Sequence, residues 1–397
     1  MMGKDRLFLG VSSNILFLGV VSFFTDVSTE LIAAVLPAFL FVTLGTAPEI
    51  IGTIEGVAES LTSFLKLAAG VVADKTGDRK RLTMAGYSLS NFVKPLMGLV
   101  SSWPQVMALR MADRIGKGIR TPPRDAIIAD GAEESKMGKA FGIHRTLDQL
   151  GAVVGPLLAF ALLSPLGFGG IFLFTIIPGS IAVAVLSIFV KEPKRRQNAD
   201  KTALKGATKI MNGTFSMFIG SATLYAVAAI SYSFILLRGI EMGLPTEYTA
   251  LLYAGIQACH VLAGYPAGVI SDRLGRFKAV QIGYALLFTS FLTISLAPST
   301  HIFVVGAALF GLHQGVIETS QRAIVPSLVP YEYKGTAYGI YNTAIGIVAL
   351  PTNLAAGFIF SALGSAATFG YGAAFALVAS AAMALTQWRI SKSRSND

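Results

Sequence analysis

Acidic residues recur one helical turn apart inside long apolar stretches of this sequence. Asp26 and Glu30 form one such pair, and Glu55 and Glu59 form a second. Residues four positions apart lie on the same face of a helix. Apolar surroundings favour the neutral form of a carboxylic acid, whereas a nearby cation favours its charged form. Carboxyl groups in such positions could therefore take up and release protons.

Other charged residues share this apolar setting. Asp113 and Arg114 lie together in a further stretch, and His144, Arg145 and Asp148 lie in the next one. A charge deep in an apolar segment is costly, and it is usually functional and paired. Arg114 and Arg145 are the expected cationic partners of the acids. The predicted proton-coupling residues are Asp26, Glu30, Glu55, Glu59, Asp113, Arg114 and Asp148.

Asp26, Glu30, Glu59 and Asp113 are expected to be the leading proton carriers, with Arg114 as the charge that resets them. The alternative is that some of these residues form static ion pairs. The second half of the chain is instead polar and aromatic at the corresponding depth, which suggests a division of labour. The predicted substrate-binding residues are Asn91, Arg145, Tyr232, Gln257, His260, His313, Gln314, Tyr341 and Asn342. Acid and imidazole groups could also bind a divalent cation, which leaves a metal as a second candidate substrate.

The composition indicates that lipid surrounds these stretches. Of the 397 residues, 53% are hydrophobic and 14% are charged, whereas a soluble domain carries about 25% charged residues. A spanning helix needs about 20 mostly apolar residues. We predict twelve such helices, over residues 13–43, 48–72, 82–101, 104–128, 137–163, 169–190, 213–240, 247–270, 279–297, 302–327, 334–362 and 368–388.

Lysine and arginine predict the orientation. They gather in alternate connections and at both ends of the chain, and the other connections contain neither residue. Cytoplasmic loops carry this excess of basic residues, so both termini are expected in the cytoplasm and the protein in the cell membrane. The net charge of +10 is therefore attributed to orientation in the membrane, with no nucleic acid as a partner. A single cysteine, Cys259, excludes a disulfide framework.

The two halves of the chain repeat each other. The segment from Gly70 to Arg79 is similar to the segment from Gly268 to Arg276, and a second matching pair lies at nearly the same offset. A parallel repeat of six spans builds one large class of transporters, with the substrate site at the interface of the halves. We predict a first half over residues 1–190, a cytoplasmic linker over 191–212 and a second half over 213–397.

At these residues the chain resembles the major facilitator superfamily over essentially its whole length. The loop motif after the second span and its echo after the eighth are similar to the loop that clamps the cytoplasmic side in that family. Gly151-x-x-x-Gly155-Pro156 resembles the motif of the exporting, antiporter branch, and Arg114 matches an arginine that the family links to proton transfer. The resemblance implies gating roles for Gly70, Asp74, Gly77, Arg79, Gly151, Gly155, Pro156, Asp272, Arg273 and Gly275.

The expected fold is an all-α integral membrane protein of twelve transmembrane helices in two pseudo-symmetric halves of six. The expected function is proton-coupled export of a small organic compound by alternating access, in a monomer that needs no cofactor. A divalent metal ion or metal chelate is the alternative substrate. A receptor or lipid-handling protein with the same fold is a further alternative. No hydrolase motif or nucleotide-binding loop is present in the sequence, so an enzyme and an ATP-driven pump are not expected.

Overall fold

The computed structural model describes residues 7–8, 11–76, 78–132, 136–192, 210–211, 213–330 and 333–394. The chain divides into two compact units. The first unit comprises Met1–Leu44, Leu61–Ala199 and Glu247–Ala254, and the second comprises Gly45–Ser60, Asp200–Thr246 and Gly255–Asp397. Each unit therefore includes a short stretch from the other half of the sequence. The predicted boundaries at residues 190 and 213 stay a prediction, and the linker lies largely outside the described residues.

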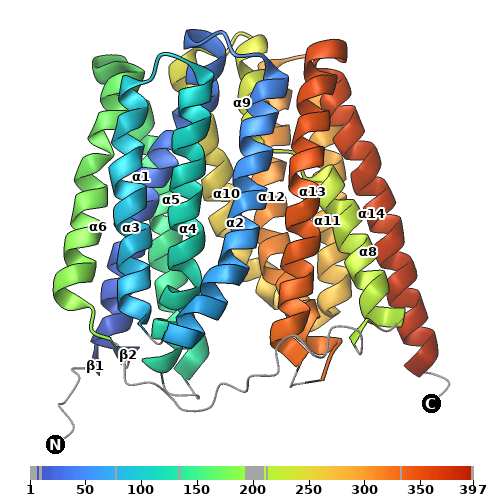
Figure 1. Ribbon diagram of the computed structural model, residues 1–397. Coiled ribbons are helices and arrows are strands. Elements are labelled where there is room, and N and C mark those ends of the chain that lie inside the picture. Colours follow the sequence, from blue (N-terminus) through green and yellow to red (C-terminus); the bar gives the residue numbers. More distant parts are fainter. Residues whose placement is uncertain are drawn as a thin grey trace, which may run out of the picture. The chain divides into compact units, whose positions relative to one another are not determined.

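The first unit is built from long helices that run side by side (Figure 1). α1 packs along α5 and α6, and α3 packs along α4 and α6. A short antiparallel hairpin of β1 (Leu7–Phe8) and β2 (Val11–Ser12) precedes α1. The helices of this unit are α1 (Ser13–Ala38), α3 (Arg79–Leu96), α4 (Trp103–Asp130), α5 (Met137–Phe174) and α6 (Ile176–Phe189).

The second unit follows the same plan. α11 packs against α12 and α14, and α8 packs against α13 and α14. Its own helices are α8 (Gly213–Ala228), α9 (Tyr232–Glu241), α11 (Arg276–Leu296), α12 (Thr300–Ile324), α13 (Lys334–Leu363) and α14 (Ser365–Arg394). Two helices, α2 (Pro48–Thr76) and α10 (Thr246–Leu274), contribute residues to both units. The core of the second unit is rich in aromatic side chains such as Phe215, Phe218 and Tyr284.

Helices in the described residues overlap all twelve predicted spans, with α8 and α9 sharing one of them. Within those residues, seven helical segments are long and apolar enough to cross a membrane, and the segment Met137–Phe189 includes both α5 and α6. The prediction of an all-α membrane fold is confirmed. α5 is bent at Gly167, whose φ of 64° lies in the left-handed region that glycine adopts without strain. The predicted boundary between the fifth and sixth spans falls at this bend.

A single continuous helix was predicted over residues 213–240, but the structure has a break in this region. α8 ends at Ala228 and α9 begins at Tyr232. Backbone groups freed by a break in a membrane helix must find other partners. The Ser231 backbone N–H donates to Oδ1 of Asn353 at 2.8 Å, and the Ser231 hydroxyl accepts from the Ser233 backbone N–H at 3.2 Å. Asn353 lies on α13, so a contact that is remote in sequence stabilises this break.

Candidate functional site

Glycines of α5 bring this helix against the acidic face of α1. A Cβ atom added at Gly151 would lie 3.1 Å from the Cβ of Asp26 and would meet the carbonyl oxygen of Phe23. A Cβ atom added at Gly155 would lie 2.8 Å from the carbonyl oxygen of Val27 and 3.0 Å from the Cβ of Glu30. Small residues allow two membrane helices to approach closely. The Gly151-x-x-x-Gly155 motif therefore positions α5 directly on the two predicted proton carriers of α1.

Asp26 of α1 and Asp148 of α5 meet at this contact. Their side chains are close enough to interact, and the approach of Gly151 to the Cβ of Asp26 places both acids at the same point of the helix contact. The Ser22 hydroxyl donates to Oδ1 of Asp148 at 2.5 Å, and Nη1 of Arg145 donates to its Oδ2 at 3.2 Å. Nη1 of Arg124 donates to the Ser22 hydroxyl at 3.4 Å. An ionised carboxylate only accepts hydrogen bonds, so a bond between two carboxyl groups requires one proton.

A second cluster surrounds Asp113 on α4. Its Oδ2 lies 3.9 Å from Nε of Arg114 and 4.0 Å from Nη1 of Arg110. Lys94 of α3 and Arg120 also lie within electrostatic reach of this carboxylate. Nζ of Lys94 donates to the Thr29 hydroxyl of α1 at 2.7 Å. The expected pairing of Asp113 with Arg114 is therefore present, within a larger group of cations.

Lys94 and Arg110 belong to the cluster around Asp113, although no role for them was predicted from the sequence. Lys94 is only 2% exposed, and so is Arg110. Their positions inside the predicted apolar spans 82–101 and 104–128 could have indicated that they are functional. Their importance depends on Asp113, which lies on a different helix from Lys94. A buried cation can be assigned to a site only when its neighbours in the structure are known.

Glu30 has a partner that is remote in sequence. The Tyr253 hydroxyl donates to Oε2 of Glu30 at 2.7 Å. Tyr253 belongs to the stretch Glu247–Ala254 of α10 that forms part of the first unit. Glu55 and Glu59 of α2 belong to the second unit instead. The predicted proton-coupling residues that share the first unit are Asp26, Glu30, Asp113, Arg114 and Asp148.

Several predicted substrate-binding residues form polar pairs in the second unit. Nε2 of His260 on α10 lies 2.9 Å from Oε2 of Glu318 on α12. Nε2 of His313 lies 3.0 Å from the Tyr225 hydroxyl, and its Nδ1 lies 2.7 Å from the carbonyl oxygen of Gly283. A carbonyl oxygen only accepts, so Nδ1 of His313 donates. This pattern ties α12 to α8 and α11.

The remaining predicted substrate-binding residues of the second unit differ in exposure. Gln257 and Tyr341 are buried, and Asn342 is exposed. The Oε1 atom of Gln314 is buried without a hydrogen-bond partner among the described residues. Tyr232 begins α9 next to the helix break. The structure therefore distributes these residues over several helices, and their common role in binding stays a prediction.

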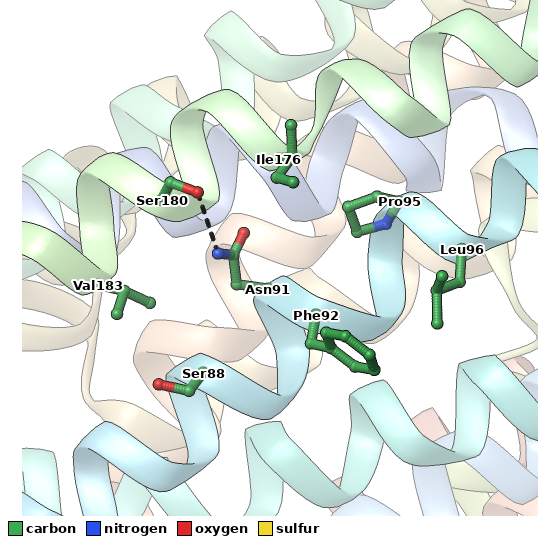
Figure 2. Close-up of a pocket in the computed structure, with 8 residues that line it drawn as sticks. All are labelled: Ser88, Asn91, Phe92, Pro95, Leu96, Ile176, Ser180 and Val183. Carbon is green, nitrogen blue, oxygen red and sulfur yellow. Dashed lines mark hydrogen bonds between the residues drawn. The ribbon is translucent and has the colours of Figure 1, made fainter.

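Asn91 lies in a cavity between α3 and α6. Figure 2 shows its side chain pointing toward Ser180, and Nδ2 of Asn91 donates to the Ser180 hydroxyl at 3.3 Å. The cavity measures about 280 Å³, and exposed side chains such as Phe92 and Ile176 line it. None of the predicted proton-coupling residues belongs to this lining. Asn91 thus lies on a different surface from the carboxyl pair.

One predicted gating residue, Arg79, forms contacts at the start of α3. The Arg79 guanidinium pairs with Asp130 at the end of α4. The backbone N–H groups of Arg79 and Lys80 donate to the Glu192 carboxylate at 3.2 and 2.6 Å. An acidic group at a helix N-terminus is stabilised by the helix dipole. These contacts join the ends of three helices within the first unit.

Other predicted gating residues are less constrained by their surroundings. Gly275 joins α10 to α11 with a φ of 88°, in the left-handed region that glycine adopts without strain. Asp272 and Arg273 are exposed on α10. Pro156 is buried in α5, and Gly70 approaches Pro122. Gly77 lies outside the described residues, as does the side chain of Asp74.

Comparison with known proteins identifies the family. The sequence profile of the Major Facilitator Superfamily matches residues 16–350 and, in a second match, residues 217–397. The chain belongs to the major facilitator superfamily. An uncharacterised MFS-type transporter of Methanocaldococcus jannaschii is 31% identical over 93% of both chains. The protein is therefore a multi-pass membrane transporter, as the loop motifs and the twelve spans predicted.

One relative and one solved structure with lower sequence identity are also similar to this transporter. The multidrug resistance protein MdtH of Blochmanniella pennsylvanica is 20% identical over 77% of this chain and 75% of its own length. The crystal structure of a POT family transporter in complex with a thioalcohol conjugated peptide superimposes with a TM-score of 0.83. It covers 97% of this chain and 98% of its own, at 14% sequence identity. This structural likeness confirms the fold.

Proposed function

We propose that this transporter exports a small organic compound in exchange for protons, and that Asp26 and Asp148 together form the proton-binding site. The close approach of α5 to α1 at Gly151, which brings the side chains of Asp26 and Asp148 near enough to interact, is the observation that carries the proposal. Two ionised carboxylates in contact repel each other strongly, so one proton is shared when both groups are together. A site that holds one exchangeable proton is what coupling to a proton gradient requires.

The neighbouring groups suggest which carboxyl group carries the proton. Ser22 and Arg145 donate hydrogen bonds to Asp148, and hydrogen bonds to the charged form of a carboxyl group favour that form. Asp26 then holds the proton. Its loss leaves two negative charges side by side, and their repulsion favours a state in which α1 and α5 hold these groups further apart. Proton release is coupled in this way to a change of conformation.

The other predicted carriers receive different roles in this proposal. Asp113 has Arg110 and Arg114 nearby, which keeps it charged and suits it to balancing their charge. Glu30 accepts a hydrogen bond from Tyr253 and is a candidate second proton-binding group. Glu55 and Glu59 belong to the second unit, and their role in proton coupling stays a prediction.

Export of an organic compound is supported by two further observations. The Gly151-x-x-x-Gly155-Pro156 motif resembles that of the antiporter branch of the family, and one relative is named a multidrug resistance protein. The geometry gives the metal alternative no support, because no group of three or more His, Cys, Asp or Glu side chains forms a metal-ligand cluster within the described residues.

Reconstitution in proteoliposomes tests this function. The purified protein is placed in vesicles that enclose a pH-sensitive dye, and organic compounds and divalent metals are added in turn. We expect an organic compound to cause a substrate-dependent pH change. Asp26→Asn should abolish uphill transport driven by a pH gradient, whereas exchange of substrate without a gradient should survive because exchange needs no proton release.

Glu241→Gln provides the control, since Glu241 lies at the end of α9 in the second unit and pairs with Arg238. It should transport like the wild type. Full gradient-driven transport in both Asp26→Asn and Asp148→Asn would refute the proposed proton site. A pH change that depends on metals but on none of the organic compounds would instead establish the alternative substrate.

A further inference from the structure

The interior of the first unit carries more positive than negative charge. Four cations are almost completely buried there: Lys94, Arg110, Arg114 and Arg120 are 2, 2, 7 and 4% exposed. Among the described residues of this unit, Asp113 is the only carboxylate buried to the same degree, with 2% exposure. Burying an ion is costly unless an opposite charge accompanies it. One carboxylate among four cations leaves a region of positive potential.

The hydrogen-bond partners of Lys94 and Arg120 are neutral groups. Nζ of Lys94 donates to the hydroxyl groups of Thr29 and Ser28 at 2.7 and 3.5 Å. Nη1 of Arg120 donates to the Ser90 hydroxyl at 2.8 Å, and its guanidinium lies 4.5 Å from the centre of the Tyr87 ring. Hydroxyl and aromatic groups are neutral, so these contacts satisfy the N–H donors of Lys94 and Arg120 but do not balance their positive charge.

The other acidic groups of the first unit have partners of their own. Asp148 accepts hydrogen bonds from Ser22 and Arg145, and it shares a contact with Asp26. Glu30 accepts a hydrogen bond from Tyr253. A proton shared between Asp26 and Asp148 lowers the negative charge of this region further. Asp26 is within electrostatic reach of Lys94, so the excess of positive charge around Lys94 is larger when Asp26 and Asp148 share a proton than when both are ionised.

We propose that the cluster of Lys94, Arg114 and Arg120 binds an anionic group, a carboxylate or a phosphate, of the transported compound. This inference rests on the proposed transport function and adds the chemical class of its substrate. Guanidinium groups bind carboxylates and phosphates through paired, charge-assisted hydrogen bonds. A cluster with low-dielectric walls also concentrates ions of opposite sign. The compound supplies the negative charge that the protein lacks at this cluster.

A charge series on one ring tests this substrate class without any transport step. The probes are benzoate, phenyl phosphate, benzyl alcohol and benzylamine, added to the purified full-length protein in detergent. A ligand that binds the native state raises its melting temperature. We expect benzoate or phenyl phosphate to raise the melting temperature, and benzyl alcohol and benzylamine to have much smaller effects. The relative effects of benzoate and phenyl phosphate distinguish a carboxylate from a phosphate site.

Variants locate the binding of the anionic probe. Lys94→Met and Arg114→Gln should each weaken the apparent affinity for it by about tenfold or more, the range for a lost charge-assisted hydrogen bond. Arg114→Lys keeps the charge and should weaken the apparent affinity less. This variant replaces Arg114→Gln in the test if Arg114→Gln does not fold. Arg81→Gln is the matched control, because the Arg81 side chain is 88% exposed. It should bind like the wild type.

Three results would overturn the assignment. These are equal or greater stabilisation by benzylamine, no greater effect of both anions than of benzyl alcohol, and unchanged anion affinity in every Lys94 and Arg114 variant. The experiment is independent of proton coupling. Anion binding together with full gradient-driven transport in Asp26→Asn and Asp148→Asn would refute the proton site while leaving the anionic substrate class in place.

Discussion

The Tyr253 hydroxyl donates a hydrogen bond to the Glu30 carboxylate at 2.7 Å, although 223 positions separate the two residues in the sequence. Tyr253 is buried, and it lies on the stretch Glu247–Ala254 that is part of the first unit. A hydrogen bond to a charged group contributes about 1.5–3 kcal/mol. This bond therefore helps to attach the α10 stretch to α1.

Removal of this hydroxyl should loosen the α10 stretch. Tyr253→Phe keeps the ring but loses the donor, so we expect faster amide hydrogen exchange over residues 247–254. Tyr248→Phe is the matched control, because Tyr248 is half-exposed and packs edge-on against the ring of Phe160. Exchange should change little in this control. Equal protection of residues 247–254 in wild type and Tyr253→Phe would show that the bond does not hold the stretch in place.

The closeness of α1 and α5 predicts the effect of a single methyl group. Gly151→Ala would place a Cβ atom against the Phe23 carbonyl oxygen and 3.1 Å from the Cβ of Asp26. Overpacking of this kind costs about 1–3 kcal/mol. We expect a lower melting temperature and reduced proton-coupled transport, because the Asp26–Asp148 contact is pushed apart.

Gly142 offers the control on the same helix. A Cβ atom added there meets nothing within 4 Å, and alanine is favoured over glycine inside a helix by about 0.5–1 kcal/mol. Gly142→Ala should therefore be neutral or slightly stabilising, with normal transport. Similar melting temperatures for the two alanine variants would contradict the proposed close packing.

The contacts at the start of α3 predict a kinetic effect. Asp130→Asn removes the charge that pairs with Arg79, and the clamp that the family resemblance implies should weaken. We expect slower transport of any substrate with little change in substrate affinity, because the change acts on the equilibrium between conformations. Initial rates and affinities in proteoliposomes separate the two quantities. Lys139→Gln, an exposed change on α5, should leave both unchanged. A change in affinity alone would argue for a binding role instead.

The membrane helices could be predicted because each depends on a largely continuous run of apolar residues. The break between α8 and α9 could not, since Ala228, Ala229 and Ile230 are themselves apolar and the break depends on Asn353 of another helix. The site divides in the same way. Depth in the spans identified Asp26 and Asp148 as candidates, but their contact and the role of Lys94 depend on packing between helices.

The final prediction separates Asp113 from Asp26. Asp113→Asn leaves Lys94, Arg110 and Arg114 without their nearest carboxylate. Breaking a buried ion pair by removing one partner costs about 3–5 kcal/mol. We therefore expect poor expression or a markedly lower melting temperature. Asp26→Asn should fold well instead, because a neutral amide replaces a carboxyl group that is itself neutral when it holds the proton.

A second substitution identifies the cause. Lys94→Met combined with Asp113→Asn removes one charge of each sign, so the double variant should lose less stability than the two single variants together. Coupling between neighbouring groups typically amounts to about 0.5–3 kcal/mol, and melting temperatures of the four proteins measure it. Strict additivity would mean that Lys94 and Asp113 act independently. Wild-type stability in Asp113→Asn would mean that this carboxylate does not balance the cations, and would return it to the list of candidate proton carriers.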